Sequence, residues 1–253
     1  MVDRDLARRA SAEAVGTAFL VAIVVGSGIA AQRLSSGDVG LQLLENSTAT
    51  GAGLVALILA LGPVSGAHFN PIVTLADRVL GGISTRDAGV YTVAQVAGGC
   101  VGVVVANLMF GLPAVTLSTH TRSSGALWLG ELVAAFGLLL VILGVVRAGR
   151  GSVAAYAVGG YIAAAYWFTS STSFANPAVT IARCLTNTFS GIAPSSVPMF
   201  IVMQIAGALI AVVLARFWHP TLHSADLVEP DTSESGERAV VEVATETGRR
   251  EHD

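Results

Sequence analysis

The sequence predicts an all-α membrane protein with six transmembrane helices and two re-entrant half-helices, arranged as an inverted repeat. Three observations support this fold class: an apolar composition, six apolar segments of spanning length, and two copies of an Asn-Pro motif. Of the 253 residues, 53% are hydrophobic and only 12% are charged, and the mean hydropathy is +0.69. Because a soluble domain carries about twice this share of charge, most of the chain is expected to lie in a bilayer.

The two Asn-Pro motifs are near-copies of each other, 106 residues apart. They occupy residues 67–77 and 173–183, and in each the Asn-Pro step precedes an apolar run. Proline is favoured at the first position of a helix, and asparagine is a good N-cap. Each motif therefore predicts a short helix of about two turns that begins at Asn-Pro and is too short to cross a membrane.

Six longer apolar segments surround the motifs. Each has about 17 to 23 residues, enough to cross about 30 Å of hydrocarbon. The predicted spans are residues 11–32, 47–63, 89–110, 126–146, 152–167 and 197–217. Three spans per half give the halves opposite orientations, with repeat 1 over about 11–115 and repeat 2 over about 126–218. The two Asn-Pro segments then enter the membrane from opposite faces.

Charge is distributed unevenly along the chain. Residues 1–10 form a basic N-terminal segment, which precedes the membrane domain at 11–218. Residues 221–253 hold nine acidic residues and three Arg, so 219–253 is expected to be an acidic, disorder-prone tail. With both termini in the cytoplasm, eleven Arg lie on the cytoplasmic side and three on the other side. The positive-inside rule predicts this orientation.

Polar residues inside the spans also recur in both halves. Glu13 and Glu131 stand near the start of each half, and Gln95 and Gln204 stand in each third span. An ionisable residue in a span is a functional candidate, so the two Glu could couple an ion. Their matched placement favours a structural role instead, in which each accepts N–H bonds from the re-entrant loop of its half. The two Gln are expected to hydrogen-bond between helices.

The two half-helices are expected to meet at the membrane midplane. Both positive helix ends then point at one place, which opposes cations and proton transfer. The Asn amides can donate to a passing oxygen, so the site favours small neutral polar molecules. His68 is expected to line the cytoplasmic side of this pore, with gating by protonation as an alternative. The midplane residues are Asn70, Pro71, Ile72, Asn176, Pro177 and Ala178.

These residues resemble the major intrinsic proteins, the family of aquaporins and aquaglyceroporins. The resemblance covers roughly residues 11–217 and includes Ser-Gly-Ala-His-Phe-Asn-Pro at 65–71 and Glu-Ala-Val-Gly-Thr at 13–17. It implies a passive channel that passes small neutral solutes, with no enzymatic activity and no cofactor. It also implies a homotetramer in the lipid bilayer with one pore per subunit, and no nucleic-acid partner.

The chain departs from the family pattern in two places. The first motif has Ile72 where the family usually has Ala, which is expected to narrow the midplane slightly. Val179 follows the second Asn-Pro-Ala, where water-selective members carry Arg. The nearest Arg is Arg183, about 6 Å further along the same helix face, and is expected in the outer vestibule. Counted back without gaps, the other filter positions are Thr50, Ala164 and Ser173.

These four filter residues predict a wide, weakly polar constriction without a fixed charge. The pattern resembles a bacterial branch associated with arsenic resistance. That resemblance implies a cell-membrane channel for arsenous acid, a trihydroxylated solute similar in size to glycerol, and for water. A strictly water-selective channel is one alternative. An ion-coupled secondary transporter is another, because inverted repeats with broken helices also build transporters.

Overall fold

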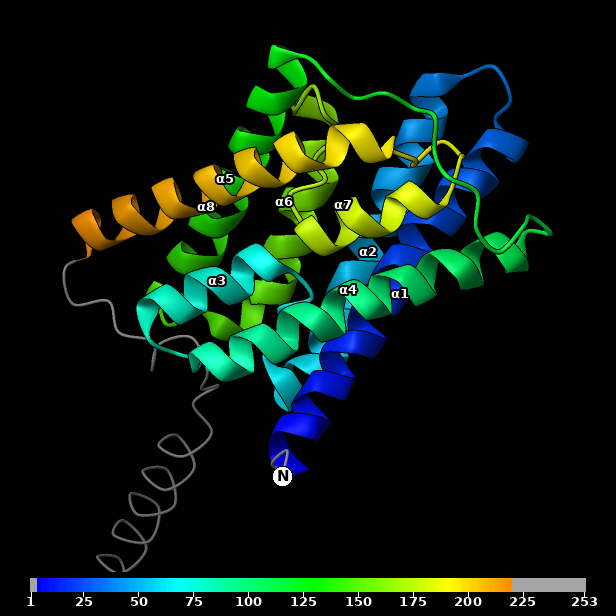
Figure 1. The fold of residues 1–253 in the computed structure, drawn as a ribbon. Helices are drawn as coiled ribbons and strands as arrows, with labels where there is room; N and C mark the ends of the chain where they lie inside the picture. The colour runs from blue at the N-terminus through cyan, green and yellow to red at the C-terminus, as the bar shows by residue number, and fades with distance from the viewer. Residues whose placement is uncertain (1–3, 220–253) are drawn as a thin grey trace, which may run out of the picture.

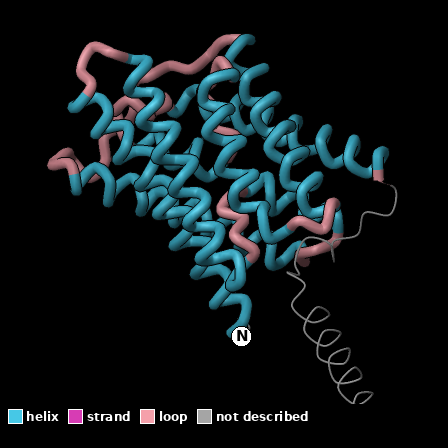
Figure 2. The backbone as a smooth tube through the Cα atoms, turned by 180° about the vertical axis from the view of Figure 1, so that it is seen from behind, coloured by secondary structure: helices cyan, strands magenta, loops and turns pink. Residues whose placement is uncertain are grey.

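The computed structural model describes residues 4–219, in which helices and loops are present and strands are not. Two short helices, α3 (Pro71–Leu80) and α7 (Pro177–Ala182), lie in the middle of the bundle, among the long helices (Figure 1). Most of the backbone in this range is helical, and loops connect the helices (Figure 2). The long helices are α1 (Arg4–Leu34), α2 (Val39–Ser65), α4 (Thr85–Met109), α5 (Gly125–Arg147), α6 (Ala154–Phe168) and α8 (Val197–Trp218).

The packing of the long helices repeats from one half to the other. Helix α1 packs against α4 in the first half, and α5 packs against α8 in the second. A Cβ added at Gly98 would lie 2.1 Å from the carbonyl oxygen of Ala14, and one added at Gly207 would lie 2.3 Å from that of Leu132. A glycine at the same place in each half therefore lets the two helices touch, as the inverted repeat requires.

The six predicted spans correspond to the six long helices. Five of them are long and apolar enough to cross a membrane, within the part of the chain that the structure describes. Helix α6 has 15 residues and continues a 3₁₀ turn at Gly151–Val153. Helices α1 and α2 begin before the predicted spans, because apolar sequence marks only the part of a helix that lies in lipid. Of the predicted tail at 219–253, all but the first residue lies outside the described residues.

Both half-helices begin where the sequence predicts, at a capping asparagine. The Oδ1 atom of Asn70 accepts a hydrogen bond from the N–H of Ile72 at 3.1 Å. The Oδ1 atom of Asn176 accepts one from the N–H of Ala178 at 3.0 Å. Helix α3 has 10 residues and α7 has six, after which a 3₁₀ turn takes over at Arg183–Leu185. The second half-helix is therefore the shorter one.

Candidate functional site

Each half-helix follows a loop in which several residues adopt left-handed backbone angles. The angle φ is +49° at Ala67 and +47° at Phe69 in the first loop. It is +52° at Ser173 and +45° at Ala175 in the second. A residue other than glycine in this region costs on the order of 1–3 kcal/mol. Each loop therefore requires strong partners on the helices around it.

In the first loop, Glu13 supplies this support. Its carboxylate is fully buried and accepts the backbone N–H groups of His68 at 2.9 Å and Phe69 at 2.7 Å. The Ser65 hydroxyl donates to it at 2.7 Å, and the Gln95 amide at 2.8 Å. Four donors on one carboxylate offset the cost of burying its charge. Glu13 is therefore occupied inside the loop support and is not aimed at the pore.

Glu131 has the same place in the second half. It is fully buried and accepts the backbone N–H groups of Phe174 and Ala175, both at 2.9 Å. The Gln204 amide donates to Glu131 and, at 2.9 Å, to the Thr180 hydroxyl. The two predicted Glu–Gln pairs therefore stand under equivalent loops, where their oxygens are engaged by the chain itself.

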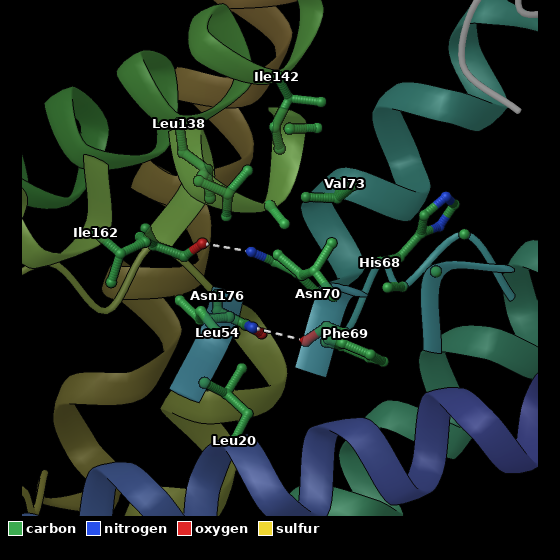
Figure 3. Close-up of a pocket in the computed structure, with 18 of the residues that line it drawn as sticks. Leu20, Leu54, His68, Phe69, Asn70, Val73, Leu138, Ile142, Ile162 and Asn176 are labelled. Atoms are coloured by element: carbon green, nitrogen blue, oxygen red, sulfur yellow. Dashed lines mark hydrogen bonds between the residues drawn. The ribbon is translucent and has the colours of Figure 1, made fainter. Parts of the chain in front are cut away.

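The two loops are also bonded directly to each other by the asparagines of the motifs. The Asn70 side-chain amide donates to the carbonyl oxygen of Ala175 at 2.8 Å, and that of Asn176 donates to the carbonyl oxygen of Phe69 at 2.8 Å (Figure 3). An amide nitrogen has two N–H groups. One N–H of each asparagine fixes the opposite loop, and the second is left for a molecule in the cavity.

A cavity of about 600 Å³ extends along both half-loops. Its lining includes both motif asparagines, His68 and Arg183. Helices α3 and α7 lead away from the asparagines in opposite directions (Figure 1), which puts the His68 side and the Arg183 side at opposite ends. We refer to these two ends as the His68 end and the Arg183 end. Apolar side chains from the long helices face the asparagines (Figure 3). Those labelled there are Leu20, Leu54, Leu138, Ile142 and Ile162. A solute would therefore meet hydrogen-bond donors on one side and hydrocarbon on the other.

The predicted filter and midplane residues fall into two groups. Thr50, Ser173 and Val179 are buried in the chain and line the cavity. Ile72 is 1% exposed and packs in the hydrophobic core, and it is not among the residues lining this cavity. The Ile72 side chain, larger than the usual Ala, is accommodated behind the loop. The structure therefore does not show the expected narrowing of the midplane by Ile72. Pro71, Pro177 and Ala178 likewise lie behind the cavity wall.

The structure corrects the filter position assigned to Ala164. This residue is exposed on the outer face of α6, and the cavity is lined instead by Ile162 and Tyr166. Residues four apart share a helix face, whereas a residue midway between them points away. The Tyr166 hydroxyl lies 3.2 Å from the Thr50 hydroxyl, so these two side chains form one polar position. Ungapped counting could not detect the helix phase that decides this.

Arg183 is more enclosed than a vestibule residue would be. It is 3% exposed, lines the cavity, and has its guanidinium carbon 3.5 Å from the centre of the Phe174 ring. Its Nε also donates to the carbonyl oxygen of Ser190. Arg122, from the loop before α5, lies 5.2 Å from the same ring. Burial lowers the pKa of Arg122, although an arginine stays charged at neutral pH. Two fixed positive charges thus flank Phe174.

The His68 end has a different pair of side chains. The Nδ1 atom of His68 lies 3.1 Å from the Thr74 hydroxyl, and its Nε2 atom lies 3.8 Å from the Oδ2 atom of Asp77. Asp77 also lines the cavity, and sequence reasoning missed it. A signal was available, because Asp77 and Arg183 each stand seven residues after the Asn of their motif. Arg122 and Tyr166 were missed because tertiary contacts alone bring them to the site, whereas Phe174 could have been found as the counterpart of His68, two residues before the motif Asn.

Two capped half-helices that meet over one cavity inside an inverted repeat define a membrane channel. A family model described as "Major intrinsic protein" matches residues 1–173 and 149–247. The chain is 52% identical over 217 residues to "Aquaglyceroporin AqpS" of Rhizobium meliloti (strain 1021), covering 86% of this chain and 92% of that protein. It is 30% identical over 240 residues to "Probable aquaporin AqpM" of Archaeoglobus fulgidus, covering 84% and 97%. The chain therefore belongs to the major intrinsic protein family.

A solved structure has the same fold. The X-ray structure of the aquaglyceroporin from Plasmodium falciparum superposes with a TM-score of 0.66 at 23% identity, and the match covers 87% of this chain and 98% of that one. The predicted fold class is confirmed. Members of this family are channels for small neutral solutes and not enzymes, so the prediction of a multi-pass membrane channel is confirmed as well. The alternative of an ion-coupled secondary transporter is therefore ruled out.

Proposed function

We propose that the chain is a passive channel for water and for small uncharged solutes with several hydroxyl groups, glycerol and arsenous acid among them. Val179 carries this proposal. It directly follows the second Asn-Pro-Ala and lines the cavity as a neutral side chain, while the nearest cation is one helical turn further on, at Arg183. The 52% identity to a protein named as an aquaglyceroporin supports passage of glycerol.

The proposed filter consists of Thr50, Ser173 and Val179, with Tyr166 in place of Ala164. Ser173 lines the cavity, and its buried hydroxyl oxygen has no hydrogen-bond partner among residues 4–219. The paired hydroxyls of Thr50 and Tyr166 offer a second polar position. A solute with several hydroxyl groups can engage both positions and then the two asparagine amides. A water molecule needs fewer of these hydrogen-bonding positions than such a solute does.

The proposed assembly is a homotetramer in a bacterial cell membrane, with both termini in the cytoplasm. The excess of Arg on the terminal side of the membrane supports this orientation. It places the His68 end of the cavity toward the cytoplasm and the Arg183 end outside. The membrane domain then covers residues 11–218. Glu13, Glu131, Gln95 and Gln204 act in it as supports of the loops and not as ion-coupling groups.

Stopped-flow light scattering on the purified chain in liposomes tests the proposal. The wild-type chain should give fast shrinkage in each osmolyte and then re-swelling in glycerol and in arsenous acid. Val179→Arg should reduce solute flux much more than water flux, because it returns a bulky cation to the filter. Val179→Leu is the matched control, since it adds volume without charge and should have the smaller effect.

Two outcomes would contradict this function. Equal loss of water and solute flux in Val179→Arg would show that residue 179 does not discriminate between them. Fast water flux with no re-swelling in the wild-type chain would favour the water-selective alternative. In that case the enclosed guanidinium of Arg183 would be the group that narrows the pore.

A further inference from the structure

A buried carboxylate in the cavity has no evident structural purpose. Asp77 is 5% exposed and lines the cavity, and its Oδ1 atom has no hydrogen-bond partner in the described part of the chain. Buried polar atoms in folded proteins are nearly always hydrogen-bonded, and a carboxylate is costly to leave unpaired. Glu13 and Glu131, by contrast, are surrounded by donors. The chain therefore leaves this carboxylate uncompensated in the cavity wall, and Oδ2, on the side of His68, is the oxygen left for a ligand.

The surroundings of Asp77 do not compensate its charge. It lies in the last turn of α3, where the helix dipole disfavours an anion. Among residues 4–219, the one basic side chain within ion-pair distance is the imidazole of His68, at 3.8 Å. Arg9, which also lines the cavity, bonds to Asp5 at 2.7 Å and Asp87 at 3.0 Å. Arg78 donates to the Thr85 hydroxyl at 2.8 Å. A stabilising ion pair therefore does not account for Asp77.

The turn after α3 leaves room for this carboxylate. A Cβ added at Gly82 would lie 2.0 Å from Oδ1 of Asp77 and 2.8 Å from its Cγ. The three nearest contacts of that Cβ are all atoms of the Asp77 carboxylate. A side chain at position 82 would therefore displace the carboxylate and little else. This makes Gly82 a means of moving the charge without removing it.

The internal repeat gives Asp77 an equivalent in the other half. In the first half, His68 lies two residues before the motif Asn and Asp77 lies seven residues after it. In the second half, Phe174 and Arg183 occupy the same two positions. Both pairs are in contact, at 3.8 Å between His68 Nε2 and Asp77 Oδ2 and at 3.5 Å between the Arg183 guanidinium and the Phe174 ring. All four side chains line the cavity. The position seven residues after the motif Asn therefore carries a hydrogen-bond acceptor, Asp77, at the His68 end and a donor, Arg183, at the opposite end.

We propose that Asp77, held beside His68, is a solute-binding site at the His68 end of the pore. Its carboxylate accepts hydrogen bonds from the O–H groups of an uncharged polyhydroxylated molecule, and Arg183 donates to oxygens of the same class of molecule at the opposite end. Water gains less than a polyol does, because a polyol bound to Oδ2 of Asp77 through one hydroxyl group has a second hydroxyl group for the neighbouring His68 ring. This inference rests on the proposed function, since it assumes that polyols enter the pore.

Uptake of radiolabelled glycerol into proteoliposomes, measured over a range of glycerol concentrations, tests this site. Asp77→Asn keeps the shape but replaces a charge-assisted hydrogen bond by a neutral one, so the half-saturating glycerol concentration should rise about fivefold. Gly82→Ala should raise it as well, because the carboxylate is displaced. Asp77→Glu should restore part of the wild-type value. Asp38→Asn, which exchanges one good N-cap for another on the exposed loop before α2, is the control and should match wild type.

Water permeability of the same vesicles separates binding from folding. We expect the water permeability of Asp77→Asn and Gly82→Ala to stay within about twofold of wild type, because the loops and their Glu supports are untouched. Unchanged half-saturation in Asp77→Asn and Gly82→Ala would overturn the proposal. Loss of water and glycerol flux together in both would also overturn it, because Asp77 would then be structural. If the wild-type chain takes up no glycerol, the proposed function itself fails. If the wild-type chain takes up glycerol and the variants have the same half-saturating glycerol concentration, this inference alone fails.

Discussion

The two half-loops share one scaffold and differ in the charges that they bring to the cavity. In both, a motif Asn caps the half-helix and bonds to the opposite loop, and a buried Glu holds the loop N–H groups. In the first half, His68 and Asp77 then line the cavity. In the second half, Phe174 and Arg183 stand at the equivalent positions. One backbone design therefore supports an acidic end and a basic end.

This difference shows which positions the fold constrains. The scaffold residues satisfy backbone groups that lack helical partners, so only a few side chains suit each position. The residues two before and seven after each Asn point into the cavity, where water or solute can satisfy them. Their chemistry is therefore free to differ between the halves, and selectivity can be set there without disturbing the loops.

The largest effect is expected where the two halves are most alike. Glu13→Ala and Glu131→Ala each leave at least two buried backbone N–H groups without an acceptor, at about 1–3 kcal/mol per group. Each variant should lose on the order of 5 kcal/mol, which approaches the whole stability of a domain. Thermal unfolding of the detergent-solubilised chain measures this loss. The Glu→Gln variants keep one acceptor oxygen and should be intermediate. A large loss at one site alone would break the equivalence of the two scaffolds.

The helix contacts offer a second test of equivalence. Gly98→Ala and Gly207→Ala each place a Cβ within 2.3 Å of a backbone carbonyl oxygen, so the helices must move apart. Both should lower the free energy of unfolding by about 1–3 kcal/mol. Gly144→Ala is the matched control, because its Cβ would meet nothing within 4 Å, and it should be neutral or slightly stabilising. Unequal effects at Gly98 and Gly207 would show that one helix pair can adjust and the other cannot.

Removing one charge at a time tests the difference between the ends. Arg183→Leu should raise proton leak about tenfold, since a charge about 10 Å away contributes about 1.5 kcal/mol to the barrier at an effective dielectric constant of about 20. Asp77→Asn removes an anion and should not raise the leak. A pH-sensitive dye trapped in proteoliposomes reports both. An unchanged leak in Arg183→Leu would mean that the two helix ends exclude protons without this side chain.

The smallest effects should come from exchanging the two rings. Phe174→His replaces the phenyl face under Arg183 by a smaller polar ring, and His68→Phe removes the hydrogen bond to Thr74 and the polar neighbour of Asp77. Each should cost about 1 kcal/mol of stability. The midpoint of thermal unfolding gives this loss, and the double variant should be close to the sum of the two single changes. A strongly non-additive result would show that the two ends are coupled through the loops.

The sequence alone determined the membrane fold, the inverted repeat and the place where both half-helices begin. These properties depend on local chemistry, namely apolar segments of spanning length and an Asn-Pro step that can start a helix. The matched Glu and Gln pairs were also visible, because each half repeats them in order. Helix ends were harder to predict, since α1 and α2 begin before the apolar segments.

The tertiary structure decided which side chains reach the cavity. It turned Ala164 outward and Tyr166 inward, placed Ile72 in the core, and enclosed Arg183 against Phe174. It also placed Asp77 in the cavity wall, with its Oδ1 atom left without a hydrogen-bond partner among residues 4–219. These outcomes depend on helix phase and on contacts between residues far apart in the chain. Hydrophobic pattern and motif spacing specify which elements form, whereas the packing between elements specifies the side chains that a solute meets.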